Sequence, residues 1–266
     1  VPTEMVRKLY DECETILVLE DGYPFLEEML RGLLNHGKQI NGRMDGTVPR
    51  DGELNPNIVA VALGMKDEWG NPIPEVVAPR PPSLCKGCPH IFSYNSLNEA
   101  IAEFGKGRVF SDIGCYTLGA LQPYDAISSC VDMGASITMA KGAADAGLVP
   151  AVAVIGDSTF THSGMTGLLD AVIDKSPITV LVLDNATTAM TGGQPSSASG
   201  KIEDICLALG VEKEHIHVIN PIPKNHEENM NIMKQELMYK GVSVIIPRRE
   251  CIVTATKRLK EKRKVK

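Results

Sequence analysis

Gly156-Asp157-Ser158, followed downstream by Asp184-Asn185, is the stretch that decides the fold of this chain. The preceding residues 151–155 are typical of a buried strand, residues 163–175 of a helix, and residues 178–183 of a second buried strand. Near-continuous apolar strands belong to parallel sheets that helices cover on both faces. Both polar stretches therefore follow carboxyl ends of parallel strands, which is the edge where open α/β sheets bind ligands.

The same polar residues have the chemistry of a site for a cation and a diphosphate. A hard divalent cation takes oxygen ligands, and Asp157 and Asn185 supply a carboxylate and an amide carbonyl. Ser163 is the expected N-cap of the following helix, and Pro177 lies beyond its end. The free N–H groups and the dipole of that helix favour a diphosphate near Ser158. Composition and spacing thus predict a site for thiamine diphosphate and magnesium. An ordinary strand-to-helix turn, capped by Asp157 and Ser158, is the alternative.

Two long motifs carry a family resemblance. They are Ile-Gly-Asp-Ser-Thr-Phe-Thr-His-Ser-Gly at 155–164 and Leu-Asp-Asn-Ala-Thr-Thr-Ala-Met-Thr-Gly at 183–192, with shorter matches at Cys85-Lys86-Gly87-Cys88-Pro89-His90 and Asp112-Ile113-Gly114-Cys115-Tyr116. Over residues 79–255 the chain resembles the thiamine diphosphate domain of the alpha subunit of indolepyruvate ferredoxin oxidoreductase, in the 2-oxoacid:ferredoxin oxidoreductase superfamily. Ser158 departs from the Gly-Asp-Gly usual in the wider family but agrees with the indolepyruvate branch.

The resemblance assigns roles to particular residues. It implies magnesium ligands at Asp157, Asn185 and the backbone carbonyl of Thr187. It implies cofactor contacts from Gly114, Gly156, Asp157, Ser158, Asn185, Thr187, Met190 and Thr191. His162 directly follows the diphosphate motif and is a candidate catalytic residue, although a lone histidine in a turn is more often structural. His90 is a weaker candidate of the same kind.

The cysteines give a second signal. Seven cysteines, an odd number, and no secretory signal sequence predict a reducing cytoplasm rather than a disulfide scaffold. Thiolates at turns can hold a 4Fe-4S cluster, and the resemblance extends that role to Cys85, Cys88, Cys115 and Cys251. Structural zinc on the same four residues is one alternative, and no metal at all is another. The remaining cysteines, Cys13, Cys130 and Cys206, are expected to be buried small hydrophobes.

Composition excludes several classes of protein. A chain of 266 residues with 43% apolar residues can bury a sizeable core. No apolar run approaches the ~20 residues that span a bilayer, and a net charge of −6 gives no general attraction to nucleic acid. We therefore expect a soluble cytoplasmic protein that contacts neither membrane nor nucleic acid. The basic run 257–266 is read as a solvated tail, with contact to an acidic partner such as ferredoxin as the alternative.

The expected organisation has four parts. Residues 1–71, with a strand at 14–20, a helix at 24–35 and turns over 37–57, are read as the tail of a preceding α/β domain. Residues 72–84 are a Pro-rich linker, 85–256 the thiamine diphosphate-binding domain, and 257–266 the basic tail. The third part is predicted to be an α/β doubly wound, mostly parallel sheet, with strands at 108–111, 151–155, 178–183 and 242–246.

The resemblance also implies a reaction and partners. The reaction is oxidative decarboxylation of a 2-oxo acid, with indolepyruvate or another aryl pyruvate favoured, in which coenzyme A takes the acyl group and ferredoxin the electrons. Family alpha subunits have a pyrimidine-binding domain before this region and a two-cluster ferredoxin domain after it, and neither pattern occurs here. We therefore expect an oligomer, inactive alone, completed by a pyrimidine-binding domain or subunit and a gamma- or beta-type subunit. A non-oxidative thiamine-dependent decarboxylase or carboligase, and a non-catalytic scaffold subunit, are the alternatives.

Overall fold

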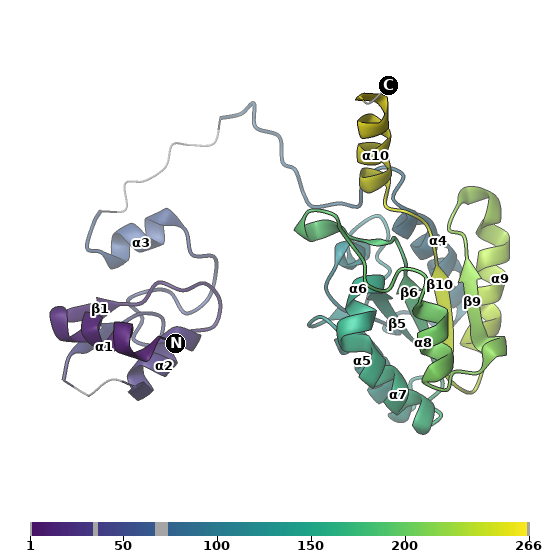
Figure 1. Cartoon of the computed structure of the whole chain (residues 1–266), viewed down its shortest axis with the longest axis horizontal. Coiled ribbons are helices and arrows are strands. Elements are labelled where there is room, and N and C mark those ends of the chain that lie inside the picture. The colour runs from purple at the N-terminus through teal and green to yellow at the C-terminus, as the bar shows by residue number, and fades with distance from the viewer. Residues whose placement is uncertain (1, 34–36, 67–73, 265–266) are drawn as a thin grey trace. The chain divides into compact units, whose positions relative to one another are not determined.

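The computed structural model describes residues 2–33, 37–66 and 74–264, and the chain forms two compact units, Val1–Pro79 and Arg80–Lys266 (Figure 1). Residues 72 and 73 of the predicted linker lie outside the described residues, and 74–84 contain neither helix nor strand.

The first unit is built around two short parallel strands. In it β1 (Thr15–Leu17) pairs with β2 (Gln39–Asn41), which places Ile16 opposite Ile40. Three helices accompany them, α1 (Thr3–Glu12), α2 (Phe25–Leu33) and α3 (Pro56–Ala62). The strand predicted at 14–20 is thus shorter than expected, and α1, β2 and α3 were not predicted. The predicted helix 24–35 corresponds to α2, and its residues 34 and 35 lie outside the described part of the chain.

The second unit contains a six-stranded sheet in which every pairing is parallel, in the order β4-β3-β5-β6-β10-β9. The strands are β3 (Val109–Ser111), β4 (Ser129–Cys130), β5 (Ala151–Gly156), β6 (Ile178–Leu183), β9 (Ile216–Ile219) and β10 (Ser243–Pro247). The predicted α/β class with a parallel sheet is confirmed, whereas β4 and β9 were missed. A small antiparallel hairpin, β7 (Thr187–Thr188) with β8 (Gln194–Pro195), follows β6.

Helices cover both faces of this sheet, as its apolar strands require. Successive side chains of a strand point to opposite faces, and β5 divides accordingly. Ala153 and Ile155 pack with α5 (Ala135–Asp145), α7 (Met165–Ile173) and α8 (Ile202–Ala208). Val152 and Val154 pack with α4 (Pro89–Ile101) and α9 (His226–Leu237). Short 3-10 turns complete the unit: η1 (Ala102–Phe104), η2 (Cys115–Ala120), η4 (Ala189–Thr191), η5 (Lys213–His215) and η6 (Pro223–Asn225).

The helix after β5 starts earlier than the sequence predicts. A helical run begins at Asp157 as α6 (Asp157–Thr159), passes through one π-helical turn, η3 (Phe160–Gly164), and continues as α7. The prediction of Ser163 as N-cap is therefore wrong, because Ser163 lies inside the π turn, where its hydroxyl contacts His162 Nδ1 at 2.5 Å. Single π turns occur frequently at functional sites. Asp157 itself lies in the first turn of the helical run.

Lys141, on α5, forms ion pairs that link α5 to the carboxyl end of α7. Lys141 Nζ lies 2.7 Å from an Asp174 carboxylate oxygen, 2.9 Å from Asp145 and 3.6 Å from Asp170. Hydrogen bonds to Asp174 and Asp145 raise the pKa of Lys141. The single positive charge of Lys141 is therefore shared among three carboxylates that α5 and α7 bring together.

The basic run near the end of the chain is helical. Residues 257–264 continue α10 (Ile252–Lys264), which projects from the α/β layers in Figure 1, and the side chains of residues 257–262 are exposed. Residues 265 and 266 lie outside the described residues. Across the described ranges, no helix combines the length and the apolar character that crossing a bilayer demands.

Candidate active site

A crevice opens at the carboxyl edge of the sheet, between β3 and β5. The chain leaves β3 toward β4 and leaves β5 toward β6, on the opposite side, so the two following loops diverge. Such a switch point is where doubly wound sheets bind ligands. A cavity of about 210 Å³ lies there, and all eight predicted cofactor residues line it: Gly114, Gly156, Asp157, Ser158, Asn185, Thr187, Met190 and Thr191.

Two glycines that line this cavity make room for the ring of Tyr116, which lines it too. A Cβ atom added to Gly114 or to Gly156 would overlap the ring of Tyr116, which fills the space between the ends of β3 and β5. The Tyr116 hydroxyl donates a hydrogen bond to the buried Asp112 carboxylate. Asp112 also accepts hydrogen bonds from the backbone N–H of Gly134 (3.0 Å) and the hydroxyl of Ser136 (3.1 Å). Burial raises the pKa of Asp112 to about 6.

Asp157 has the surroundings of a cation ligand. It is only 3% exposed, and its Oδ1 accepts a hydrogen bond from the N–H of Ser158 at 2.7 Å. Its Oδ2 is buried and has no hydrogen-bond partner among the described residues. Burial raises the pKa of Asp157 to about 6, and the negative charge of Asp184 acts in the same direction. Because an unpaired buried carboxylate oxygen is costly, the carboxylate fits a bound cation.

Asn185 is oriented by a buried histidine. Asn185 Nδ2 lies 3.3 Å from Nε2 of His90, and an amide nitrogen can only donate, so that ring nitrogen accepts. Burial lowers the pKa of His90 to about 4, which keeps the ring neutral for this role. The other end of the amide, Oδ1, accepts a hydrogen bond from the N–H of Thr187 at 3.1 Å. The side-chain oxygen of Asn185 is thereby directed toward Thr187.

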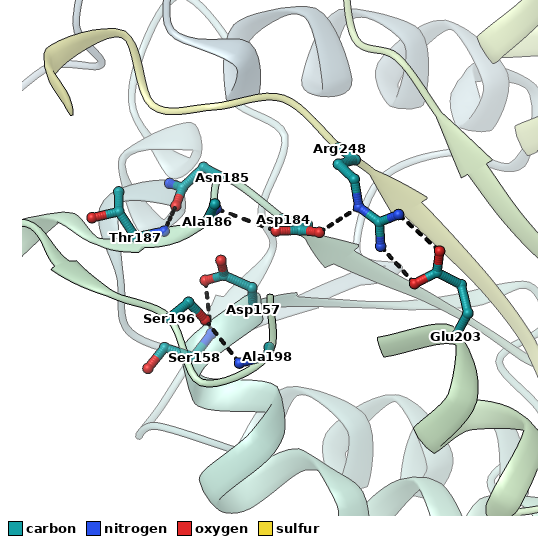
Figure 2. Close-up of polar contacts among 10 residues, drawn as sticks. All are labelled: Asp157, Ser158, Asp184, Asn185, Ala186, Thr187, Ser196, Ala198, Glu203 and Arg248. Carbon is teal, nitrogen blue, oxygen red and sulfur yellow. Dashed lines mark hydrogen bonds and ion pairs between the residues drawn. The ribbon is translucent and has the colours of Figure 1, made fainter. Parts of the chain in front are cut away.

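The loop 184–187, which carries the candidate ligands Asn185 and Thr187, contains one residue in the left-handed conformation (Figure 2). Ala186 has φ of 60°, an uncommon conformation for a residue with a side chain. Its N–H donates to Asp184 Oδ1 at 3.2 Å, which closes a local turn. Figure 2 shows Asp157 between this loop, 184–187, and the segment that carries Ser196.

The four cysteines proposed as cluster ligands line a second cavity of about 320 Å³, together with His90 and Asn185. Cys85 is exposed, Cys115 is half-buried, and Cys88 and Cys251 are buried. Burial raises the pKa of Cys88 to about 11 and also raises the pKa of Cys115. Within the described ranges, no three His, Cys, Asp or Glu side chains are arranged to hold a metal ion.

The two cavities are neighbours. Cys115, Asn185 and Ala189 line both of them. A backbone hydrogen bond also links the two sets of candidate ligands, since the N–H of Cys251 donates to the carbonyl of Asn185 at 3.1 Å. The crevice between β3 and β5 and the cavity lined by the four cysteines therefore share a wall.

Some predicted residues lie elsewhere. His162 is exposed and is not among the residues that line either cavity. The remaining cysteines also lie outside both cavities, and the expected burial holds for Cys206 but not for Cys13 and Cys130, which are half-buried.

Sequence reasoning missed four residues that organise the site: His90, for which only a weak role was expected, Asp112, Tyr116 and Arg248. Asp112 follows a predicted strand directly, and this position was a usable signal. His90 contacts a residue 95 positions away, and Arg248 contacts one 64 positions away. No local sequence pattern can predict contacts over such separations.

Two curated proteins are similar to this chain over most of its length. An "Indolepyruvate oxidoreductase subunit IorA" from Archaeoglobus fulgidus is 33% identical over 276 residues, and one from Methanothermobacter marburgensis is 36% identical over 276 residues. Each alignment covers 95% of this chain but only 43% and 44% of the respective relative, so the chain spans less than half the length of these relatives.

A solved structure shares the fold. It is a 2-oxoglutarate:ferredoxin oxidoreductase from Magnetococcus marinus, with a TM-score of 0.53 and 18% sequence identity, covering 65% of this chain and 66% of that one. The family model described as "Thiamine pyrophosphate enzyme, C-terminal TPP binding domain" matches residues 112–246, about half of the chain. This chain therefore belongs to the thiamine pyrophosphate enzyme family and carries its C-terminal TPP binding domain.

Proposed function

We propose that this chain is the thiamine diphosphate-binding part of an indolepyruvate-type 2-oxoacid ferredoxin oxidoreductase, which forms an acyl-coenzyme A and passes electrons to ferredoxin. The observation that carries the proposal is the shared wall between a diphosphate crevice and a cavity lined by four cysteines. The site of decarboxylation in the crevice would then lie next to a one-electron acceptor in the cysteine cavity. The names of the curated relatives and the fold of the 2-oxoglutarate enzyme support the same reading.

Different groups of this chain would bind the magnesium ion and the diphosphate of the cofactor. Asp157, Asn185 and the carbonyl of Thr187 would hold Mg²⁺, since each supplies the oxygen ligands that this cation prefers. The backbone N–H groups at the start of the helical run that begins at Asp157 would receive the diphosphate. Gly114 and Gly156 lack Cβ atoms and so leave room for the ring of Tyr116, which lines the cavity where the cofactor would bind. Bound thiamine diphosphate supplies an electron sink for the loss of carbon dioxide from a 2-oxo acid.

The lining of the crevice supports an aromatic 2-oxo acid. Ile113, Met133, Leu183 and Met190 line the cavity beside the polar residues. Methionine adapts its shape and makes favourable contacts with aromatic rings. An aryl pyruvate such as indolepyruvate fits that apolar lining, while coenzyme A, which is bound in the 2-oxoglutarate enzyme's structure, is the proposed acyl acceptor.

The cysteine cavity would hold a 4Fe-4S cluster on Cys85, Cys88, Cys115 and Cys251. Four thiols around one cavity are the donor set that such a cluster takes. Bound there, the cluster would supply a one-electron acceptor next to the crevice. A single zinc ion is less well supported, because it would need the four sulfurs tightly gathered around one point, and the described residues show no such grouping.

The proposed partners follow from the same function. A pyrimidine-binding domain or subunit would complete the crevice, a gamma- or beta-type subunit would complete the complex, and ferredoxin would take the electrons. The described residues Ile113, Met133 and Met190 are partly exposed apolar side chains at the mouth of the crevice, which suits a covering partner.

An assay of the assembled complex tests this function. Anaerobically purified protein with its partner subunits, thiamine diphosphate, Mg²⁺ and coenzyme A is expected to reduce ferredoxin when indolepyruvate is added, and to contain iron and acid-labile sulfide. Carbon dioxide release without iron or electron transfer would instead indicate a non-oxidative decarboxylase. Failure to bind either cofactor would indicate a scaffold subunit.

The basic helix α10 leads to a prediction about the electron acceptor. The exposed Lys86, Lys257 and Lys260 line a groove that also contains the exposed Cys85. An acidic acceptor such as ferredoxin would be steered to this groove. Changing both Lys257 and Lys260 to Glu is expected to raise the KM for ferredoxin by about tenfold at low ionic strength, with the difference shrinking as salt is added.

A matched double charge reversal controls for net charge. Lys224 and Lys234 are exposed and line neither the groove nor the cysteine cavity, so Lys224→Glu with Lys234→Glu should leave the KM for ferredoxin unchanged. Reduction of a small uncharged dye should be the same in all three proteins. Equal KM values for ferredoxin in the two double variants would assign the acceptor to another surface.

A further inference from the structure

Arg248 connects three parts of the second unit near the crevice (Figure 2). It lies directly after β10, and its Nε donates to Asp184 Oδ2 at 2.6 Å. Its two terminal nitrogens donate to the two carboxylate oxygens of Glu203, on α8, at 2.7 and 2.6 Å. Paired bonds of this kind fix the guanidinium plane. The guanidinium plane of Arg248 is therefore set by Glu203, and its Nε–H is aimed at Asp184.

Asp184 transmits this constraint to the ligand loop. Its Oδ2 is held by Arg248, while its Oδ1 accepts the N–H of Ala186, the residue in the left-handed conformation. Ala186 lies between Asn185 and Thr187, whose oxygens are the proposed cation ligands. An unfavourable backbone conformation persists only where its surroundings hold it. The Asp184 carboxylate, fixed at both oxygens, supplies that hold.

Arg248 also balances charge in the site. Asp157 and Asp184 are two carboxylates only 3% and 4% exposed, and the charge of Asp184 acts on Asp157. With Asp184 paired to the arginine, Asp157 is left as the carboxylate whose charge is available to a dication. Two unpaired acids side by side would repel each other and would disfavour a bound diphosphate.

We propose that Arg248 is the positioning residue of the cation-binding loop: through Asp184 it holds the turn at Ala186 that presents Asn185 and Thr187 to Mg²⁺. Among the contacts described, the Arg248 side chain bonds Asp184 and Glu203 but neither Asn185 nor Thr187, and Arg248 is not among the residues that line either cavity, so its action is indirect. The cation itself rests on the proposed function, whereas the hold on the loop does not.

The experiment compares Arg248→Gln with its neighbour Arg249→Gln in the full chain. Arg249 has the same charge as Arg248 and follows it directly in the chain. Among the contacts described, its side chain bonds only the carbonyl of Pro221, at 3.4 Å. In Arg248→Gln, the Mg²⁺ concentration for half-maximal thiamine diphosphate binding is expected to rise by about 10- to 100-fold, the usual effect of losing a residue that orients a metal ligand. Arg249→Gln should match the wild type.

A second readout needs no cofactor. Hydrogen exchange of the Ala186 amide, measured by NMR on the free chain, should accelerate by about tenfold or more in Arg248→Gln, because its acceptor is no longer fixed. Arg249→Gln should not change it. Lys141→Met, which removes the lysine shared by three carboxylates on α5 and α7, should lower the melting temperature without accelerating exchange at Ala186.

The outcomes distinguish a failure of the Arg248 proposal from a failure of the proposed function. Unchanged exchange at Ala186 in Arg248→Gln overturns the proposal, as does faster exchange with an unchanged Mg²⁺ dependence. If the wild type binds neither Mg²⁺ nor thiamine diphosphate, the proposed function fails, and the exchange measurement still decides whether Arg248 holds the loop. If Arg248→Gln does not fold, Arg248→Lys carries the same test with smaller shifts, since lysine keeps the charge but cannot bond both carboxylates in one plane.

Discussion

Asp157→Ala is expected to weaken Mg²⁺-dependent binding of thiamine diphosphate by roughly a hundredfold or more, the usual cost of removing one partner from a buried charged contact. The variant loses the charged ligand, whose Oδ2 is buried and without a hydrogen-bond partner in the described structure. Asn185→Ala removes only a neutral ligand, and about a tenfold loss is expected. Isothermal titration of the assembled enzyme measures both affinities.

Asp157→Asn is the matched control for folding. Burial raises the pKa of Asp157 to about 6, above its usual value, so the folded chain disfavours the charged carboxylate and loses stability as the pH rises through that value. At pH 8 without Mg²⁺, the Asn variant should therefore melt at or above the temperature of the wild type, yet bind the cofactor weakly. Undiminished affinity in either Asp157 variant would remove this residue from the metal site.

Cys251→Ser is expected to remove most of the broad visible absorption of anaerobically purified protein and to stop ferredoxin reduction. A 4Fe-4S cluster takes four cysteine ligands, and Cys251 lines the same cavity as Cys85, Cys88 and Cys115. Binding of the 2-oxo acid and release of carbon dioxide should persist, since Asp157 is unchanged. The measurements are the visible spectrum, the iron content and the separate rates of carbon dioxide release and ferredoxin reduction.

Cys13→Ser provides the comparison for this prediction. Cys13 is half-buried in the first unit and lines neither cavity, so its variant should keep the spectrum and the electron transfer of the wild type. Full absorption and full iron content in Cys251→Ser would show that other residues hold the chromophore.

The buried central strands of the second unit could be predicted from the sequence, whereas the less buried edge strands could not. The run 178–183 is apolar except for Thr179, lies between Pro177 and Asp184, and is β6 with those bounds. By contrast, β9 is a sheet edge in which His217 and Val218 are not buried, and β4 has only two residues. Neither presents the apolar run that identifies a strand. Edge strands were therefore missed where central ones were found.

The start of the helix after β5 could not be read from capping residues. Ser163 is a favourable N-cap type, but the backbone turns into a helix immediately after Gly156 and includes a π turn that no periodicity rule anticipates. The residues predicted to bind the cofactor line one cavity because they follow the carboxyl ends of neighbouring strands. Their supports, His90 on Asn185 and Arg248 on Asp184, are contacts between distant segments, which only the assembled sheet brings together.

The wall between the two cavities has a consequence for genetic dissection. A substitution at Cys115, Asn185 or Ala189 alters the lining of both cavities at once, so a loss of activity there cannot be attributed to one cofactor. Cys88 and Cys251 line only the cysteine cavity, and Asp157 lines only the crevice. Separation-of-function alleles should therefore be obtainable at those three positions, while suppressors of a Cys115 allele should have to restore two sites together.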